Sequence, residues 1–189
     1  MNKYKKIVIL LQTPISKRDF LRFGVDYFKK RGFEVYLWDL HSILFPRVNN
    51  QIVIPDPMVL NNLKKFLTKK EVLSEINELS QDTLIINYIY PSFNSFWIYR
   101  AIKKKSLDYV VCNLNNMPDL YPKIKYFSFD GVIYSFKKLT IENIFNFFLR
   151  IIPKKYFKLF GIKAAKIYII DGKKAIESTG FFIDNNTHI

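Results

Sequence analysis

Apolar runs and amphipathic stretches alternate along the chain. Continuous apolar segments are typical of strands buried on both faces of a sheet, and they occur at residues 6–11, 33–40, 83–88, 108–114 and 164–170. Apolar side chains at helical spacing predict helices at residues 17–30, 58–67, 68–79, 92–105 and 140–161, and a short strand is expected at residues 52–54. This alternation predicts an α/β fold with a Rossmann-like, mostly parallel sheet flanked by helices.

Local signals mark where some of these helices begin and end. Ser16 precedes Asp19 by three residues and Thr68 precedes Glu71 by three, which is the spacing of a capping box at a helix N-terminus. Gly32 follows the helix predicted at residues 17–30 and fits the left-handed position that ends many helices. The helix boundaries therefore follow from short-range chemistry as well as from periodicity.

The length of 189 residues fits one domain, and we expect residues 1–189 to form a single Rossmann-like unit. Residues 187–189 resemble the opening of a further strand, which is an unusual place for a domain to end. We therefore expect this unit to be the N-terminal half of a longer two-domain protein. A frayed natural end is the alternative.

The chain is strongly basic, with 30 Lys and Arg residues against 16 Asp and Glu, a formal net charge of +14. A field of this sign favours anionic partners. The excess of Lys over Arg is also what an AT-rich genome produces. Since hydrophobic residues make up 49% of the chain, a disordered protein is excluded.

Aromatic and basic side chains crowd the segment at residues 140–161, a combination that suits the headgroup layer of an anionic membrane. The candidate membrane-contact residues are Phe145, Phe148, Arg150, Lys154, Lys155 and Lys158. The alternative is a crossover helix that packs on the sheet and exposes its lysines. No apolar run is long enough to span a bilayer or to form a secretory signal, so we expect a cytoplasmic protein, peripheral at the inner membrane face. No nucleic-acid-binding signature is present, and we expect no nucleic-acid partner.

Several kinds of chemistry are excluded or disfavoured by the residues. Cys112 is the single cysteine, and it lies in an apolar run where a buried, unreactive thiol is expected. No metal-ligand motif is present, and the only histidines are His41 and His188, so no catalytic constellation stands out. The loop after the first strand has neither a dinucleotide-binding glycine motif nor a P-loop. Without those glycines, Asp39 is better explained as a strand-end or capping residue than as a ribose ligand.

Ligands of parallel sheets bind at the carboxyl ends of strands, so the loops after the strands hold the candidate site residues. In the first loop, the hydroxyls of Thr13 and Ser16 and the charges of Lys17 and Arg18 fit an anionic group. The alternative is that Ser16 only caps the helix and that Lys17 and Arg18 face solvent.

Two later loops add further candidates. Tyr90 offers a ring for stacking, and Ser92 is expected to begin a helix. Asn113 and Asn115 could hydrogen-bond to a hydroxyl-rich ligand. A buried aromatic ring, a simple helix cap and ordinary turn asparagines are the respective alternatives.

The N-terminal sequence KIVILLQTPISKRDFLRFGVDYFKKRGFEVYLWDL resembles proteins encoded in bacterial capsule and O-antigen clusters, which are similar to the N-terminal Rossmann-like half of GT-B glycosyltransferases. The likeness lies in the first strand with its TPISKRD continuation, the turn at residues 22–24 and the FEVYLWDL strand. The segment AAKIYIIDGKKAIE also resembles the last strand and helix of such a half.

The resemblance implies a surface polysaccharide biosynthesis protein in which this chain is the acceptor-side domain, facing a lipid-linked or polyanionic glycan acceptor. It implies that the nucleotide-sugar donor binds in a C-terminal half, so no cofactor is expected in this chain. No catalytic residue carries over from the family. The alternatives are a non-catalytic binding or scaffold module of a glycan assembly system and a flavodoxin-like small-molecule-binding domain.

Overall fold

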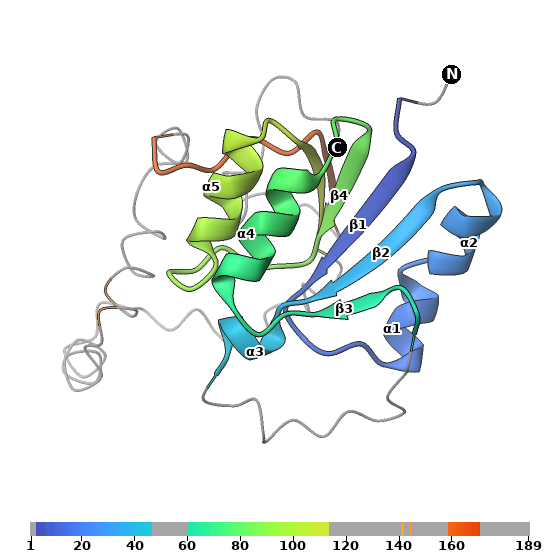
Figure 1. The fold of residues 1–189 in the computed structure, drawn as a ribbon, viewed down its shortest axis with the longest axis horizontal. Helices are drawn as coiled ribbons and strands as arrows, with labels where there is room; N and C mark the ends of the chain where they lie inside the picture. Colours follow the sequence, from blue (N-terminus) through green and yellow to red (C-terminus); the bar gives the residue numbers. More distant parts are fainter. Residues whose placement is uncertain (1–2, 47–59, 114–140, 142–143, 145–158, 171–189) are drawn as a thin grey trace, which may run out of the picture.

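The computed structural model describes residues 3–46, 60–113, 141, 144 and 159–170 of the chain (Figure 1). These residues form a six-stranded sheet with helices on both of its faces. The strands are β1 (Lys6–Leu11), β2 (Glu34–Asp39), β3 (Leu63–Lys65), β4 (Thr83–Asn87), β5 (Asp108–Asn113) and β6 (Ile167–Ile170). The α/β class predicted from the sequence is confirmed.

The order of the strands is β3-β2-β1-β4-β5-β6, and every described pair is parallel. This is the Rossmann order. If the short edge strand β3 is left out, the remaining order β2-β1-β4-β5-β6 is that of flavodoxin-like sheets. In those sheets, too, the strand order reverses beside the first strand. In either description the strand order reverses between β1 and β4.

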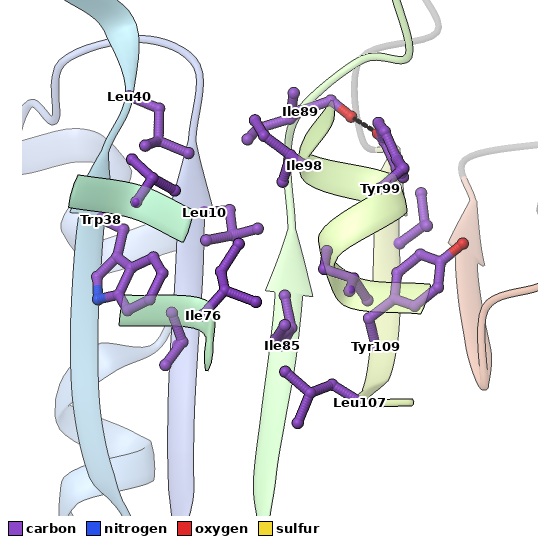
Figure 2. Close-up of a cluster of buried hydrophobic side chains, with 14 of the residues drawn as sticks. Leu10, Trp38, Leu40, Ile76, Ile85, Ile89, Ile98, Tyr99, Leu107 and Tyr109 are labelled. Atoms are coloured by element: carbon purple, nitrogen blue, oxygen red, sulfur yellow. Dashed lines mark hydrogen bonds between the residues drawn. The ribbon is translucent and has the colours of Figure 1, made fainter. Parts of the chain in front are cut away.

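The helices are α1 (Lys17–Arg22), α2 (Val25–Lys30), α3 (His41–Leu44), α4 (Lys69–Glu78) and α5 (Phe96–Lys104). Alternate side chains of the strands point to opposite faces, so the sheet separates two buried clusters. On one face, Val8, Trp38 and Ile85 pack with residues of α4 and α5, and Figure 2 shows the centre of this cluster. On the other face, Ile9 and Leu37 pack with residues of α1 and α2.

The helix predicted at residues 17–30 is two short helices, which corrects the sequence interpretation. Gly24 separates α1 from α2 and has a φ of +63°, in the left-handed region that does not continue a helix. The predicted stop at Gly32 is confirmed. Its N–H donates to the carbonyl of Lys29, and the N–H of Phe33 donates to that of Phe28, which together form a Schellman motif.

The helix predicted at residues 58–67 is wrong over its described part, because residues 63–65 form β3. Asn62 explains the difference. Its side chain donates to the carbonyl of Val35 at 2.9 Å, and its own carbonyl accepts from the N–H of Leu37 at 2.9 Å. These bonds hold the segment along the open edge of β2, and cross-strand pairing replaces the helix that the apolar spacing suggested.

Other boundaries lie close to their predictions. β1 has the predicted bounds, and the hydroxyl of Thr68 accepts from the N–H of Glu71 at the start of α4. β6 is shorter than the predicted strand at residues 164–170. Of the helix predicted at residues 140–161, Ile141 and Ile144 are helical, but residues 159–161 form a turn, so the predicted end of this helix is wrong. Residues 145–158 lie outside the described residues, as do residues 52–54.

Candidate functional site

The candidate site lies at the carboxyl edge of the sheet, between β1 and β4. Leu10 of β1 pairs with Asn87 of β4, so the loops that leave these two strands start side by side. The strand order reverses at this point, and a crevice opens there in proteins with open parallel sheets because successive loops turn to opposite faces. α3, which directly follows β2, lies at the same edge (Figure 1).

Gln12 connects the loops at this edge. Its side-chain Oε1 accepts a hydrogen bond from the N–H of Tyr90 at 3.0 Å, which joins the β1–α1 loop to the β4–α5 loop. Its backbone carbonyl lies 3.2 Å from Nδ1 of His41, at the start of α3. A carbonyl oxygen only accepts hydrogen bonds, so Nδ1 is the donor in this pair. One residue therefore fixes three chain segments relative to one another.

Asn87, at the end of β4, fixes the other side of the β4–α5 loop. Its Nδ2 donates to the hydroxyl of Tyr99 at 3.0 Å, and its Oδ1 accepts from the N–H of Ile89 at 3.0 Å. The Tyr99 hydroxyl in turn donates to the carbonyl of Ile89 (Figure 2). Asn87 and Tyr99 are buried, so these bonds replace those that water would make. The loop consequently leaves β4 with a defined course.

Tyr90 is held by its backbone while its ring faces solvent. Its N–H donates to Gln12, and its carbonyl accepts from the hydroxyl of Ser95 at 2.8 Å. The residue is 52% exposed. Phe45 and Phe93 are also exposed aromatic residues, one directly after α3 and the other in the β4–α5 loop. The side chain of Asn94 bridges these two segments by a bond to the carbonyl of Leu44 at 3.4 Å.

His41 and Asp39 form the buried part of the edge. Oδ1 of Asp39 accepts from the backbone N–H of His41 at 2.9 Å, which confirms the structural role predicted for Asp39. The ring of His41 lies against that of Phe45, with centroids 5.7 Å apart. Within the described part of the chain, Nε2 of His41 is buried without a hydrogen-bond partner.

The candidate residues of the first loop divide into one buried and three exposed side chains. The hydroxyl of Ser16 accepts from the N–H of Asp19 at 3.2 Å and donates to its carboxylate at 2.7 Å. Ser16 therefore caps α1, which was the alternative expected from the sequence. Both hydrogen bonds of its hydroxyl are made to Asp19 in the first turn of this helix. Thr13, Lys17 and Arg18 are exposed, with Arg18 3.6 Å from Asp19. These three remain accessible to an anionic group.

In the later loops, the structure corrects the expectation for Ser92 and gives the backbone position of Asn113. Ser92 does not begin the helix, because α5 starts at Phe96 after Ser95. The hydroxyl of Ser95 accepts from the N–H of Ser92 at 2.8 Å and closes the loop beneath Tyr90. Asn113 ends β5 beside Ile170 of β6, at the same carboxyl edge. Asn115 lies outside the described residues.

The Cys112 thiol has the environment of an unreactive group. Burial raises its pKa, and this outweighs the opposing effect of a hydrogen bond with Tyr88. Burial likewise raises the pKa of the Tyr88 hydroxyl. Phe23 packs against the Tyr88 ring with a centroid distance of 4.4 Å. Thiolate chemistry at neutral pH is therefore disfavoured at Cys112.

The described residues contain neither a metal-ligand cluster nor a membrane-spanning helix. No group of three or more His, Cys, Asp or Glu side chains in that part of the chain could hold a metal ion. No helix within the same ranges is long and apolar enough to cross a membrane. The membrane-contact residues expected between 145 and 158 lie outside these ranges.

Comparison of the chain with protein-family models, with curated proteins and with solved structures gave no match. The class of the protein is therefore defined by its topology, a parallel Rossmann-like or flavodoxin-like α/β sheet.

The sequence did not identify the three residues that hold the edge together, Gln12, Asn87 and Ser95. Two of them could have been suspected from their positions, since Gln12 follows a buried apolar strand and Asn87 ends another. Their partners, such as the N–H of Tyr90 for Gln12, are distant in the sequence and become visible only in the fold.

Proposed function

We propose that this chain is the acceptor-side domain of a GT-B-like glycosyltransferase that works in surface polysaccharide biosynthesis at the cytoplasmic membrane face. In this proposal the carboxyl edge between β1 and β4 holds a lipid-linked or polyanionic glycan acceptor. The nucleotide-sugar donor is bound by a second domain. The observation that carries the proposal is the exposed ring of Tyr90 on a backbone bonded through both its N–H and its carbonyl.

An exposed, fixed tyrosine suits a sugar ligand for a physical reason. The C–H groups on one face of a sugar ring form an apolar surface that packs on an aromatic ring. The sugar hydroxyls then remain free for polar neighbours, such as the exposed hydroxyl of Thr13. Because the Tyr90 backbone is already ordered, ligand binding loses little further conformational entropy there.

The first loop supports the placement of the nucleotide elsewhere. A dinucleotide pyrophosphate needs glycines that let the backbone approach it closely, and residues 12–16 contain none. The exposed Lys17 and Arg18 at this edge match the negative charge of a phosphate-linked or acidic acceptor. The membrane contact in the proposal rests on the basic, aromatic composition of residues 145–158.

The test is ligand binding by a pair of tyrosine variants. Saturation-transfer NMR with a panel of short neutral and acidic oligosaccharides identifies a binding sugar, and titration then gives its Kd. Tyr90→Ala should weaken this binding by up to about tenfold, the loss expected when one stacking contact is removed. Tyr27→Ala is the matched control, because Tyr27 is 58% exposed and lies on α2. Equal affinities of the wild type and Tyr90→Ala would refute the role of this edge.

A flavodoxin-like small-molecule domain is the second candidate. The observation in its favour is the succession of the longer strands, which matches flavodoxin-like sheets once β3 is set aside. An exposed Tyr90 at the point where the order reverses could stack on a flavin as well as on a sugar. The absorption spectrum of the purified protein after incubation with flavin mononucleotide separates the two candidates. Flavin binding by the wild type that is lost in Tyr90→Ala would support the flavodoxin-like candidate.

A further inference from the structure

A cluster of charged side chains at the amino edge of the sheet, opposite the candidate site, carries more positive than negative charge. Among the described residues, three ammonium groups surround the carboxylate of Asp108. Lys3 Nζ lies 2.5 Å from Oδ2, Lys166 Nζ lies 3.6 Å from the same oxygen, and Lys163 Nζ lies 3.5 Å from Oδ1. The hydroxyl of Tyr4 donates to Oδ2 at 2.7 Å and accepts from Lys166 at 2.8 Å. We call these five residues the Asp108 cluster.

One carboxylate does not balance these charges. Partial burial opposes ionisation of Asp108, but the hydrogen bonds from Lys3 and Tyr4 and the charge of Lys163 outweigh it and hold the pKa of this carboxyl well below its usual range. Asp108 is therefore ionised at neutral pH, and the cluster keeps a net charge of two positive units. The ammonium groups repel one another, so a further anion bound beside them would lower the electrostatic free energy of the cluster.

The ammonium groups are both accessible and positioned. The side chains of Lys3, Lys163 and Lys166 are 60%, 35% and 38% exposed, so a ligand can reach them from solvent. Lys163 Nζ lies 3.1 Å from the carbonyl of Leu107 and 3.3 Å from that of Ser106, which restricts its position. The groups come from the N-terminal segment and from residues 163–166, so the fold itself assembles them.

We propose that the Asp108 cluster binds a phosphate group. A phosphate monoester carries nearly two negative charges at neutral pH, which matches the excess of the cluster, and its oxygens accept several charge-assisted hydrogen bonds from ammonium groups. The phosphate can belong to a lipid headgroup or to a soluble phosphate ester. Leu159 and Phe160 are exposed apolar residues a few positions before Lys163, and they fit the lipid source. The cluster lies at the edge opposite Tyr90, so this site is independent of the proposed function.

The experiment uses two changes of opposite sign and a matched control. Inorganic pyrophosphate is titrated into the ¹⁵N-labelled full chain, and shifts of the amide signals of Tyr4, Asp108 and Lys166 give the Kd. The double variant Lys163→Gln/Lys166→Gln should bind at least about tenfold more weakly, since each lysine near an anion contributes roughly a factor of five. Asp108→Asn should bind about fivefold more tightly, because it removes the competing negative charge. Lys104→Gln, which changes an exposed lysine at the end of α5, should bind as the wild type does.

The outcomes separate the two sources of phosphate and the failure of the proposal. Thermal unfolding first establishes that each variant is folded, and the lysine double variant serves alone if Asp108→Asn is not. Sedimentation with vesicles that contain phosphatidic acid, whose headgroup is a phosphate monoester, assigns a lipid headgroup if it is lost in the double variant but not in Lys104→Gln. Binding of pyrophosphate without such sedimentation assigns a soluble phosphate ester. No amide shifts at the cluster, or an unchanged Kd in the double variant, overturns the proposal.

Discussion

At the carboxyl edge of the sheet, uncharged side chains join the loops, whereas at the amino edge ion pairs converge on one carboxylate. Asn87 bonds to Tyr99 and to the backbone of Ile89 through both ends of its neutral amide, and the amide oxygen of Gln12 accepts from the N–H of Tyr90. Asp108 instead gathers ammonium groups from the N-terminal segment and from the segment before β6. The same parallel sheet thus ends in two polar environments with different physical properties.

The difference predicts how each edge responds to its surroundings. Hydrogen bonds between neutral groups depend little on ionic strength and pH, so the loops around Tyr90 keep their positions as conditions change. Ion pairs between exposed groups are screened by salt and depend on protonation. Loops held by neutral hydrogen bonds suit the orientation of a glycan, and a cluster of ion pairs that responds to salt and pH suits the binding of an anion.

The largest expected effect comes from removing the side chain of Asn87, which holds the loop after β4. Asn87→Ala leaves the N–H of Ile89 without its acceptor and the hydroxyl of Tyr99 without its donor, both away from water. We expect the free energy of unfolding to fall by about 3 kcal/mol, in urea titrations at pH 7. The loss should be the same in 1 M NaCl. The exposed Asn77 of α4 provides the control, with Asn77→Ala changing stability by less than about 0.5 kcal/mol.

A smaller effect, with a different pH dependence, is expected at the charged edge. Because the pKa of Asp108 is lowered in the folded state, its stabilisation is complete above the pKa of the unfolded chain and is lost as the pH falls towards the folded value. Asp108→Asn should lower the free energy of unfolding by about 1–2 kcal/mol at pH 7, a value reduced by solvent screening. Below about pH 4, the stability of the wild type should decrease more steeply than that of the variant.

The measurement is a series of urea titrations between pH 2.5 and 7, with and without 1 M NaCl. Salt should reduce the difference between the wild type and Asp108→Asn, in contrast to the salt-independent loss in Asn87→Ala. A difference that persists unchanged in high salt and at low pH would show that Asp108 acts by packing and not by charge.

The smallest expected effect concerns Gln12, whose bond to Tyr90 is partly accessible to solvent. Gln12→Ala should lower stability by about 0.5–1 kcal/mol, since water replaces the lost acceptor in part. The amide of Tyr90 should exchange with solvent several-fold faster, as followed by hydrogen exchange and NMR. Gln81→Ala is matched to it at the opposite edge, where Gln81 donates to the carbonyl of Lys105 at 2.8 Å. That variant should leave the exchange of Tyr90 unchanged.

Sequence patterns predicted the elements that depend on local chemistry. The apolar run at residues 6–11 gave β1 its bounds, and the spacing of Thr68 and Glu71 marked the start of α4. The class of the fold followed from the alternation of such elements. The division of residues 17–30 was missed because helical periodicity continues across Gly24, and only its left-handed backbone breaks the helix.

Features that depend on distant partners were not predictable in this way. Residues 63–65 became a strand because Asn62 bonds to β2, some 25 residues earlier in the chain. Tyr90 was recognised as a candidate, but its fixed backbone depends on Gln12, which is 78 residues away. Residue type and position therefore located the edge that holds the candidate site, and tertiary contacts determined how that edge is ordered.

The long reach of the bond between Lys166 and Tyr4 has a consequence for biosynthesis. These residues are 162 positions apart, so the two ends of the Asp108 cluster meet only after nearly the whole described chain has been made. Contacts between distant residues close large loops and tend to form late in folding. During translation, Lys3 and Tyr4 are made long before Lys163 and Lys166, so the Asp108 cluster is incomplete until late in synthesis. A nascent chain that ends before residue 163 would lack both of these lysines and could not form the cluster.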